Sequence, residues 1–170
     1  WYSKAAVLGH AMAQNILGVC YAEGRGVNQV DDNKAVEWYQ KSADQNYAEA
    51  QNNLADYYYN GNVVKQNYQK AFDLYRKSAE QGIAESQFSL GNCYFEGKGV
   101  GQDYAMAIDW FVKADAQNNA DAQNVLGLCY YNGYGVEQDY VKAVEYFTKA
   151  AEQGHIVSYH YLGDCCYNGY

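Results

Sequence analysis

Apolar side chains recur at steps of three and four residues in two kinds of segment, which alternate along the chain. In the first kind, Ala50, Leu54 and Tyr58 stand four residues apart, and in the second, apolar residues follow at similar steps from Tyr140 to Ala151. Because these steps place side chains on one face of a helix, both kinds are predicted to be amphipathic helices. The first kind, which we call the A helices, is predicted in the windows 11–24, 48–61, 84–97, 120–133 and 156–169. The helical segments before and between these windows are called the B helices.

Glycines interrupt the helical pattern at regular places. Residues 97–100 read GKGV and residues 133–136 read GYGV, each between an A helix and the following B helix. Two of the B helices are followed by Gln81-Gly82 and Gln153-Gly154. Glycine suits the position after a helix, where φ is positive. Each unit is therefore predicted to be a helix, a glycine-rich turn, a second helix and a tight turn.

The pattern repeats along the whole chain. A Leu-Gly or Leu-Ala step recurs at spacings of 37, 36, 36 and 36, at Leu17-Gly18, Leu54-Ala55, Leu90-Gly91, Leu126-Gly127 and Leu162-Gly163. The extra residue of the first repeat falls between Val27 and Lys34, which predicts a surface loop there. We divide the chain into a half repeat, four full repeats and a partial repeat, with boundaries at 1–14, 15–51, 52–87, 88–123, 124–159 and 160–170. Trp1 aligns with Trp38 and Trp110 of the B helices, so we expect a fragment of a longer array.

Repeats of this kind predict an all-α fold in which helix pairs stack on their neighbours. Two helices of about 14 residues, each about 21 Å long, cannot bury their apolar faces alone. Gly18, Gly91, Gly127 and Gly163 lie inside A helices, where glycine costs about 1 kcal/mol relative to alanine. Because a position without a Cβ lets another helix approach closely, we expect these glycines at helix–helix contacts. The predicted fold is an α-solenoid of stacked antiparallel helix pairs with about 36 residues per repeat.

The composition excludes several classes of protein. The chain of 170 residues is 49% hydrophobic and contains no proline, as expected of an ordered helical protein. Its formal net charge of −8 argues against binding of nucleic acid, because phosphates require a basic surface. No run of about 18 apolar residues is present, so we expect no membrane insertion. The sequence specifies no oligomeric state.

The repeat resembles the Sel-1-like repeat, a relative of the tetratricopeptide repeat. That family shows A-x-A-Q-x-x-L-G-x-x-Y-x-x-G-x-G-V-x-x-D, followed by K-A-x-x-W/Y-Y/F-x-K-A-A-x-Q-G. The best copy matches it at Ala120-Asp121-Ala122-Gln123, Leu126-Gly127, Tyr130, Gly133, Gly135-Val136, Asp139, Lys142-Ala143, Tyr146-Phe147, Lys149-Ala150-Ala151 and Gln153-Gly154. The resemblance covers the whole chain. It departs at Asn62-Val63, which replace the Gly-x-Gly step, and at Cys166, where other copies carry tyrosine.

The resemblance has consequences for shape and for function. It implies a right-handed superhelix with the A helices on the concave side. It also implies a scaffold or adaptor that brings other proteins together by protein–protein interaction. Tetratricopeptide relatives hold peptides at the matching positions of their A helices, so the resemblance places a peptide site on these helices.

Five cysteines raise the question of thiol or metal chemistry. Cys20, Cys93, Cys129 and Cys165 share one repeat position, and Cys166 follows the last of them. Stacked repeats are separated by about 10 Å, whereas a disulfide requires Cα atoms within about 7 Å, and no paired zinc-ligand spacing occurs. We therefore interpret the cysteines as small buried packing residues and keep a thiol or metal module as an alternative. Free thiols and the lack of an N-x-S/T site favour, weakly, a cytoplasmic location; a fragment can lack its signal peptide.

Catalytic motifs are not apparent. His10, His155 and His160 flank the turns between B and A helices, without a serine–histidine–aspartate order or a phosphate loop. The glycines between A and B helices lack the Lys-Ser/Thr step of a phosphate site. We therefore expect no enzyme activity and no cofactor within these residues. A structural or regulatory segment of a larger signalling enzyme remains the alternative function.

Charge is distributed unevenly between the two sets of helices. The five A windows contain none of the 12 Lys and Arg residues, but they contain seven acids: Glu23, Glu49, Asp56, Glu85, Glu96, Asp121 and Asp164. Glu49, Glu85 and Asp121 lie in a first helical turn, where the helix dipole already favours anions. The other four acids have two interpretations: they form an anionic binding surface, or their position on the A helices is due to chance.

The A helices also repeat side-chain types at positions expected to face a partner. Asparagine can hydrogen-bond an extended peptide backbone, and aromatic rings offer apolar area and cation–π contacts. We predict an acidic groove lined by asparagine and aromatic residues that binds an extended, basic segment of a partner protein. The alternative for each residue is a solvated polar side chain or a packing aromatic. The predicted groove residues are Asn15, Asn52, Asp56, Tyr59, Asn92, Phe95, Glu96, Asn124, Tyr131, His160, Asp164 and Tyr167.

Overall fold

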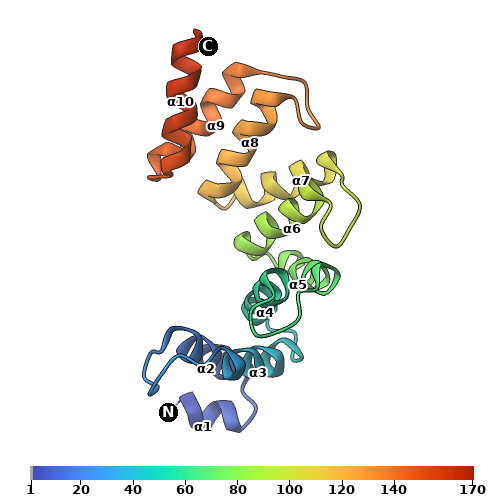
Figure 1. Cartoon of the computed structure of the whole chain (residues 1–170), viewed down its shortest axis with the longest axis vertical. Coiled ribbons are helices and arrows are strands. Elements are labelled where there is room, and N and C mark those ends of the chain that lie inside the picture. The colour runs from blue at the N-terminus through green and yellow to red at the C-terminus, as the bar shows by residue number, and fades with distance from the viewer. Residues whose placement is uncertain (1) are drawn as a thin grey trace. The chain divides into compact units, whose positions relative to one another are not determined.

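The structure, a computed structural model, describes residues 2–170. Trp1, which the sequence aligns with Trp38 and Trp110, lies outside the described residues. Within these residues the chain forms ten α-helices and no strand (Figure 1): α1 (Tyr2–Val7), α2 (Ala11–Glu23), α3 (Asp32–Ala43), α4 (Ala48–Asn60), α5 (Tyr68–Glu80), α6 (Ala84–Glu96), α7 (Tyr104–Asp115), α8 (Ala120–Asn132), α9 (Tyr140–Glu152) and α10 (Ile156–Asn168). The predicted A helices are α2, α4, α6, α8 and α10, and the B helices are α1, α3, α5, α7 and α9.

The helices form two compact units, which are described separately. The first unit ends at Ser86 and the second begins at Gln87, inside α6. In the first unit, each helix from α1 to α4 packs against the next helix along the chain. In the second unit, α7 packs on α8, α8 on α9 and α9 on α10. The predicted all-α fold of stacked helix pairs with a repeat of about 36 residues is confirmed.

Glycines inside the A helices lie directly beneath aromatic rings of the B helices. A Cβ added at Gly18 would lie 2.6 Å from the ring of Tyr39, and one at Gly127 would lie 2.5 Å from the ring of Phe147. The ring of Phe147 is fully buried. Such distances are far below van der Waals contact, so only glycine allows this approach. The expectation that the glycines lie at helix contacts is confirmed for Gly18, Gly91 and Gly127, but not for Gly163, where an added Cβ would meet nothing within 4 Å.

The turn chemistry follows the predicted pattern, with one exception. Gly61 and Gly133, just after α4 and α8, have φ values of 76° each, in the left-handed region. Asp31 and Asp139 precede α3 and α9, and their carboxylates accept hydrogen bonds from backbone N–H groups of the first helical turn. Val63 occupies a place held by glycine in other copies and still adopts a φ of 52°. This conformation is unfavourable for a β-branched residue.

Glutamine pairs connect four of the A helices, α2, α4, α6 and α8, to the end of the next B helix. Nε2 of Gln81 donates to Oε1 of Gln51 at 2.8 Å in the first unit, and Nε2 of Gln153 donates to Oε1 of Gln123 at 2.6 Å in the second. The same contact joins Gln45 to Gln14 and Gln117 to Gln87. Because glutamine both donates and accepts, one residue type satisfies both sides of the contact. These pairs explain the glutamine that precedes the Leu-Gly or Leu-Ala step in α2, α4, α6 and α8; in α10 the position is Tyr159.

Candidate functional site

The asparagines predicted to face a partner mostly hold neighbouring repeats together. Asn15 is 8% exposed, and its side-chain oxygen accepts a hydrogen bond from Asn53 at 3.1 Å. The oxygen of Asn52 accepts from the hydroxyl of Ser86 at 2.7 Å. In the second unit, Asn124 is 7% exposed, and its oxygen accepts from Ser158 at 2.9 Å. These side-chain oxygens therefore form hydrogen bonds within the protein. Whether these asparagines also contact a partner stays a prediction.

Asp56 is another predicted groove residue that makes an internal contact. Its carboxylate accepts a hydrogen bond from the hydroxyl of Tyr75 in α5 at 2.6 Å. Burial raises the pKa of Asp56 above its usual value, although the hydrogen bond from Tyr75 acts in the opposite direction. The side chain is half-buried, so this carboxylate is less available to a partner than an exposed one.

Most of the predicted aromatic row also packs inside the protein. Tyr59 contacts the ring of Tyr68 at 5.2 Å between centroids, and Tyr131 contacts the ring of Tyr140 at 5.3 Å, both edge to face. Phe95 makes the same contact with Tyr104 at 5.0 Å. These three A-helix rings are half-buried. Their partners, Tyr68, Tyr104 and Tyr140, all begin B helices, and their spacing of 36 residues is the sequence signal that could have identified the contacts.

The remaining predicted residues are more accessible. In α10, His160 is exposed and Tyr167 is 91% exposed. Nε2 of His160 lies 3.5 Å from a carboxylate oxygen of Asp164, one helical turn away. Glu96 is exposed and pairs with Lys98 at 2.7 Å, and Asn92 is half-buried. The structure therefore leaves an accessible subset of the prediction on the second unit: Asn92, Glu96, His160, Asp164 and Tyr167.

Positive side chains of the B helices lie over aromatic rings instead of near the A-helix acids. Nζ of Lys70 lies 4.0 Å from the centroid of the Tyr58 ring and donates to its hydroxyl at 2.6 Å. Nζ of Lys113 lies 3.6 Å from the centroid of the Trp110 ring. Cation–π contacts of this kind hold a lysine against its own helix pair. They were not expected from the sequence, although the spacing from Trp110 to Lys113 places both on one helical face.

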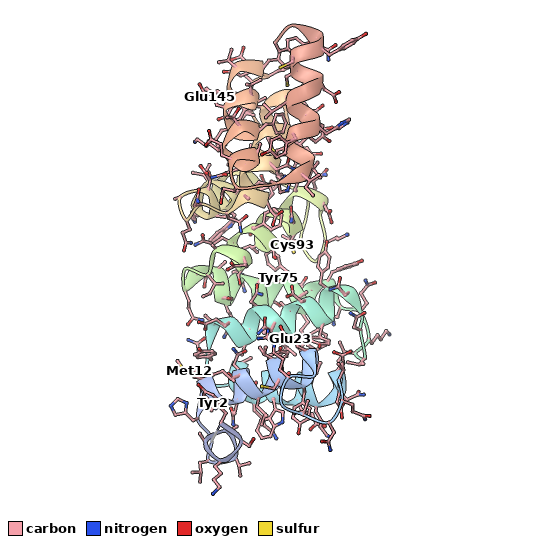
Figure 2. All side chains as sticks on the ribbon, turned by 90° about the vertical axis from the view of Figure 1, so that its left-hand side faces the viewer. Tyr2, Met12, Glu23, Tyr75, Cys93 and Glu145 are labelled. Carbon is pink, nitrogen blue, oxygen red and sulfur yellow. The ribbon has the colours of Figure 1, made fainter. Side chains whose placement is uncertain are left out.

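The cysteines support the packing interpretation. Cys93, labelled in Figure 2, and Cys129 are fully buried, and burial raises the pKa of each thiol to about 12. A thiolate is the reactive form of cysteine and the form that binds metals, so these two thiols are poorly suited to either role. Cys165 is buried as well, whereas Cys166 is exposed. Across residues 2–170, no cluster of three or more possible metal ligands is present.

Among the described helices, none combines the length and the apolar character needed to cross a bilayer.

Comparison with protein families assigns the repeats. The Sel1 repeat matches residues 11–47, 48–83, 84–119 and 120–155. The chain belongs to the Sel1 repeat family. Each matched Sel1 repeat starts four residues before the corresponding boundary chosen from the sequence, at the start of an A helix. Proteins of this family are generally scaffolds for protein–protein interactions.

Solved Sel1 repeat structures resemble the chain over nearly its whole length. The protective antigen c5321 of uropathogenic Escherichia coli strains, which displays an SLR fold, is 39% identical and has a TM-score of 0.92 over 99% of this chain and 36% of that chain. A Sel1 repeat protein from Oxalobacter formigenes is 32% identical, with a TM-score of 0.89 over 95% of this chain and 64% of that one. Immunity protein Pa5087 from Pseudomonas aeruginosa is 27% identical, with a TM-score of 0.62 over 92% of this chain and 58% of that one.

The chain spans about a third of the E. coli antigen and less than two thirds of the other two proteins. A comparison with curated proteins found no match.

Proposed function

We propose that this Sel1 repeat chain binds an extended, basic segment of a partner protein on the exposed surface of its A helices. The observation that carries the proposal is the charge of these helices. All Lys and Arg residues lie outside α2, α4, α6, α8 and α10, whereas these helices contain the seven acids named above. A surface without positive side chains attracts a cationic segment and repels an anionic one.

Part of this charge is balanced locally, which limits the residues that can act. Glu23 and Glu96, the last residues of α2 and α6, form ion pairs with Arg25 and Lys98, which lie in the turns that follow these helices. Glu49 and Glu85 are exposed in the first turns of α4 and α6. Ion pairs between exposed side chains contribute little and exchange readily with solvent. A lysine or arginine of a partner can therefore compete for these carboxylates.

The half-buried and exposed polar residues of the second unit define the best candidate contact. Asn92, Glu96, Asp164 and Tyr167 combine an amide, two carboxylates and an accessible ring. The amide suits a peptide backbone, the carboxylates suit a cation, and the ring suits the aliphatic part of a lysine side chain. The buried Asn15 and Asn124 are proposed to shape the surface from below.

The proposal is tested with a labelled, lysine-rich peptide of about 12 residues, long enough to follow one or two repeats when extended. Fluorescence anisotropy should show binding to the chain that weakens as the salt concentration rises from about 50 mM to about 300 mM. A glutamate-rich peptide of the same length should not bind. The variant Glu49→Gln, Glu85→Gln, Glu96→Gln should bind the lysine peptide less tightly.

A matched control removes the same amount of charge from the B helices. The variant Glu37→Gln, Asp109→Asn, Glu145→Gln changes three exposed acids of α3, α7 and α9. If the two triple variants lose affinity equally, only the net charge matters, and the assignment of the site to the A helices is wrong. Affinity that is the same for lysine and glutamate peptides would contradict a basic partner.

A further inference from the structure

Three of the B helices hold a lysine over the aromatic ring that stands three residues earlier. The pairs, with the distance from Nζ to the ring centroid, are Lys41 with Trp38 at 4.2 Å, Lys113 with Trp110 at 3.6 Å and Lys149 with Tyr146 at 4.8 Å. In α5, Lys77 stands at the same repeat position, but Leu74 takes the place of the ring. The exposed side chain of Lys77 contacts no ring, carboxylate or other acceptor in residues 2–170. Its ammonium group is therefore available to a ligand.

Leu74 and Lys77 line a cleft of about 360 Å³ between α3 and α5. This volume lies at the small end of the range of ligand sites in proteins. Leu74 is half-buried and packs on the hydrophobic core of the first unit, so it forms a fixed apolar wall. Lys70 lines the cleft as well, but its ammonium group already donates to the hydroxyl of Tyr58 at 2.6 Å. The cleft thus places an apolar wall beside one unengaged cation.

Asn46, in the turn after α3, contributes a second donor to the cleft. It has a φ of 62°, in the left-handed region where the equivalent turns after α5 and α9 have Gly82 and Gly154. Its side-chain oxygen accepts a hydrogen bond from Nε2 of Gln51 at 2.9 Å. Its side-chain nitrogen donates to no residue in the described part of the chain. An amide N–H and an ammonium group are both donors, and a carboxylate accepts from both at once.

The acids that line the cleft are engaged within the first unit. Oδ1 of Asp44 accepts a hydrogen bond from Nε2 of Gln40 at 2.7 Å. Oδ1 of Asp73 lies 3.2 Å from Nη2 of Arg76. Each acid has a partner of its own, and neither forms an ion pair with Lys77. A carboxylate that enters the cleft therefore gains two donors without displacing an internal contact.

The second unit has a cleft at the equivalent place, but its donors are engaged. This cleft of about 450 Å³ is lined by Asn118, Lys149 and Gln153, among others. Nδ2 of Asn118 donates to Oε1 of Gln153 at 3.1 Å, and Lys149 lies over the ring of Tyr146. The chain therefore contains its own comparison site, with the same two residue types held by internal contacts.

We propose that the cleft between α3 and α5 binds the carboxylate of a ligand that has a short apolar body. Lys77 and Asn46 donate to the carboxylate, and the apolar body contacts Leu74. A free branched-chain acid and the C-terminal carboxylate of a peptide that ends in leucine carry this same chemistry. Because the cleft is small and lined largely by exposed side chains, the affinity is expected in the millimolar range.

This site is independent of the basic segment proposed for the A helices, because its donors belong to α5 and to the turn after α3. It takes a single carboxylate. The net charge of −8 repels a run of glutamates, so a glutamate-rich peptide is still expected not to bind.

Nuclear magnetic resonance of the isotope-labelled chain, titrated with 4-methylpentanoate to about 50 mM, tests the proposal. The signals of Asn46, Leu74 and Lys77 should shift with a Kd of about 1–10 mM, whereas those of Asn118 and Lys149 should not. The neutral 4-methylpentanamide should leave all of these signals unchanged. A second titration compares the peptide acetyl-Gly-Gly-Leu with its C-terminal amide. Shifts with the free acid alone identify a small-molecule site, and shifts with the acidic peptide alone identify a site for chain ends.

Two variants separate the donor from the shape of the cleft. Lys77→Gln removes the ammonium group and should weaken binding at least tenfold. Leu74→Trp restores the ring found in α3 and α7, so the lysine should lie over it and binding should fall to a similar extent with no change of charge. Lys149→Gln removes the same charge from α9 and is the matched control, which should bind as the parent does. Circular dichroism should show equal helicity for all variants.

Three outcomes overturn the proposal. The first is a lack of shifts at Asn46, Leu74 and Lys77 with both the acid and the acidic peptide at about 50 mM. The second is an equal response of the cleft in the second unit. The third is binding that survives Lys77→Gln or that falls equally in Lys149→Gln, because net charge would then explain it.

Discussion

The helix pair α4–α5 of the first unit and the pair α8–α9 of the second share helix lengths and turns, but their interfaces differ in chemistry. All four helices have 13 residues, and both A helices end at a glycine with a φ of 76°. In the second unit, the ring of Phe147 lies on Gly127. In the first unit, Tyr75 stands at the position of Phe147, and Ala55 replaces the glycine.

In the α4–α5 pair, the tyrosine hydroxyls that have no counterpart in α8–α9 each have a hydrogen-bond partner. The hydroxyl of Tyr75 donates to Asp56, which stands where the second unit has Leu128. Tyr57 replaces the buried Cys129, and its hydroxyl donates at 2.5 Å to Asp32 of the preceding helix α3. Because a buried polar group without a partner is costly, these residues must change together. The same helix pair can therefore be built from an apolar set or from a fully hydrogen-bonded set of side chains.

Removal of the apolar ring should have the largest effect. Phe147→Ala is expected to lower the free energy of unfolding by about 3–5 kcal/mol, because it deletes a fully buried ring and leaves a cavity above Gly127. Urea denaturation followed by circular dichroism measures the change. The exposed Val141→Ala should shift the result by no more than about 0.5 kcal/mol. A loss below about 1 kcal/mol for Phe147→Ala would show that the ring is not a core residue.

Replacing the polar pair Asp56 and Tyr75 by the apolar pair of α8–α9 tests whether the two polar residues contribute to stability in a coupled way. Tyr75→Phe should cost about 1–3 kcal/mol, because the half-buried carboxylate of Asp56 loses its donor. The double variant Asp56→Leu, Tyr75→Phe reproduces the pair found in α8–α9 and should recover most of that loss. Urea denaturation of both single variants and the double variant completes the cycle. Additive effects would contradict the coupling.

The backbone of the turn after α4 should respond more weakly. Val63 has a φ of 52°, whereas Gly135 at the equivalent place has a φ of 69°. Val63→Gly is expected to raise the free energy of unfolding by about 1 kcal/mol, because glycine tolerates this conformation. Thermal unfolding provides the measurement, with Val64→Gly as the control at a neighbouring position without a positive φ. If Val63→Gly lowers the stability instead, the contacts of the valine side chain stabilise the fold by more than its unfavourable backbone conformation destabilises it.

The pH dependence of stability distinguishes the carboxylate of Asp56 from that of Asp139, which caps the start of α9. Burial raises the pKa of Asp56 above the usual 3.8, so folding favours its protonated form. Its contribution to stability is fully present below the unfolded pKa and is lost as the pH rises through the folded pKa. The carboxylate of Asp139 accepts a backbone hydrogen bond at Lys142 that lowers its pKa, so its contribution has the opposite sign and is lost as the pH falls.

Urea denaturation between about pH 3 and about pH 7 compares Asp56→Asn and Asp139→Asn with the parent chain. Relative to the parent, the Asp56→Asn variant should gain stability as the pH rises. The Asp139→Asn variant should lose it over the same range. Equal slopes for the two variants would exclude the assigned burial of Asp56.

The amino-acid sequence determined the helices, the turns and the repeat, because these depend on local patterns. Apolar steps of three and four residues, glycines after the A helices and Asp or Asn before most B helices specify each element within a few residues of itself. The tertiary structure decided which polar side chains are available to a partner. The sequence around Asn52 and Asn124 does not distinguish them from exposed asparagines. In the structure, their side-chain oxygens accept hydrogen bonds from Ser86 and Ser158, each 34 residues away. Such contacts form only when one repeat stacks on the next, so no local pattern could reveal them.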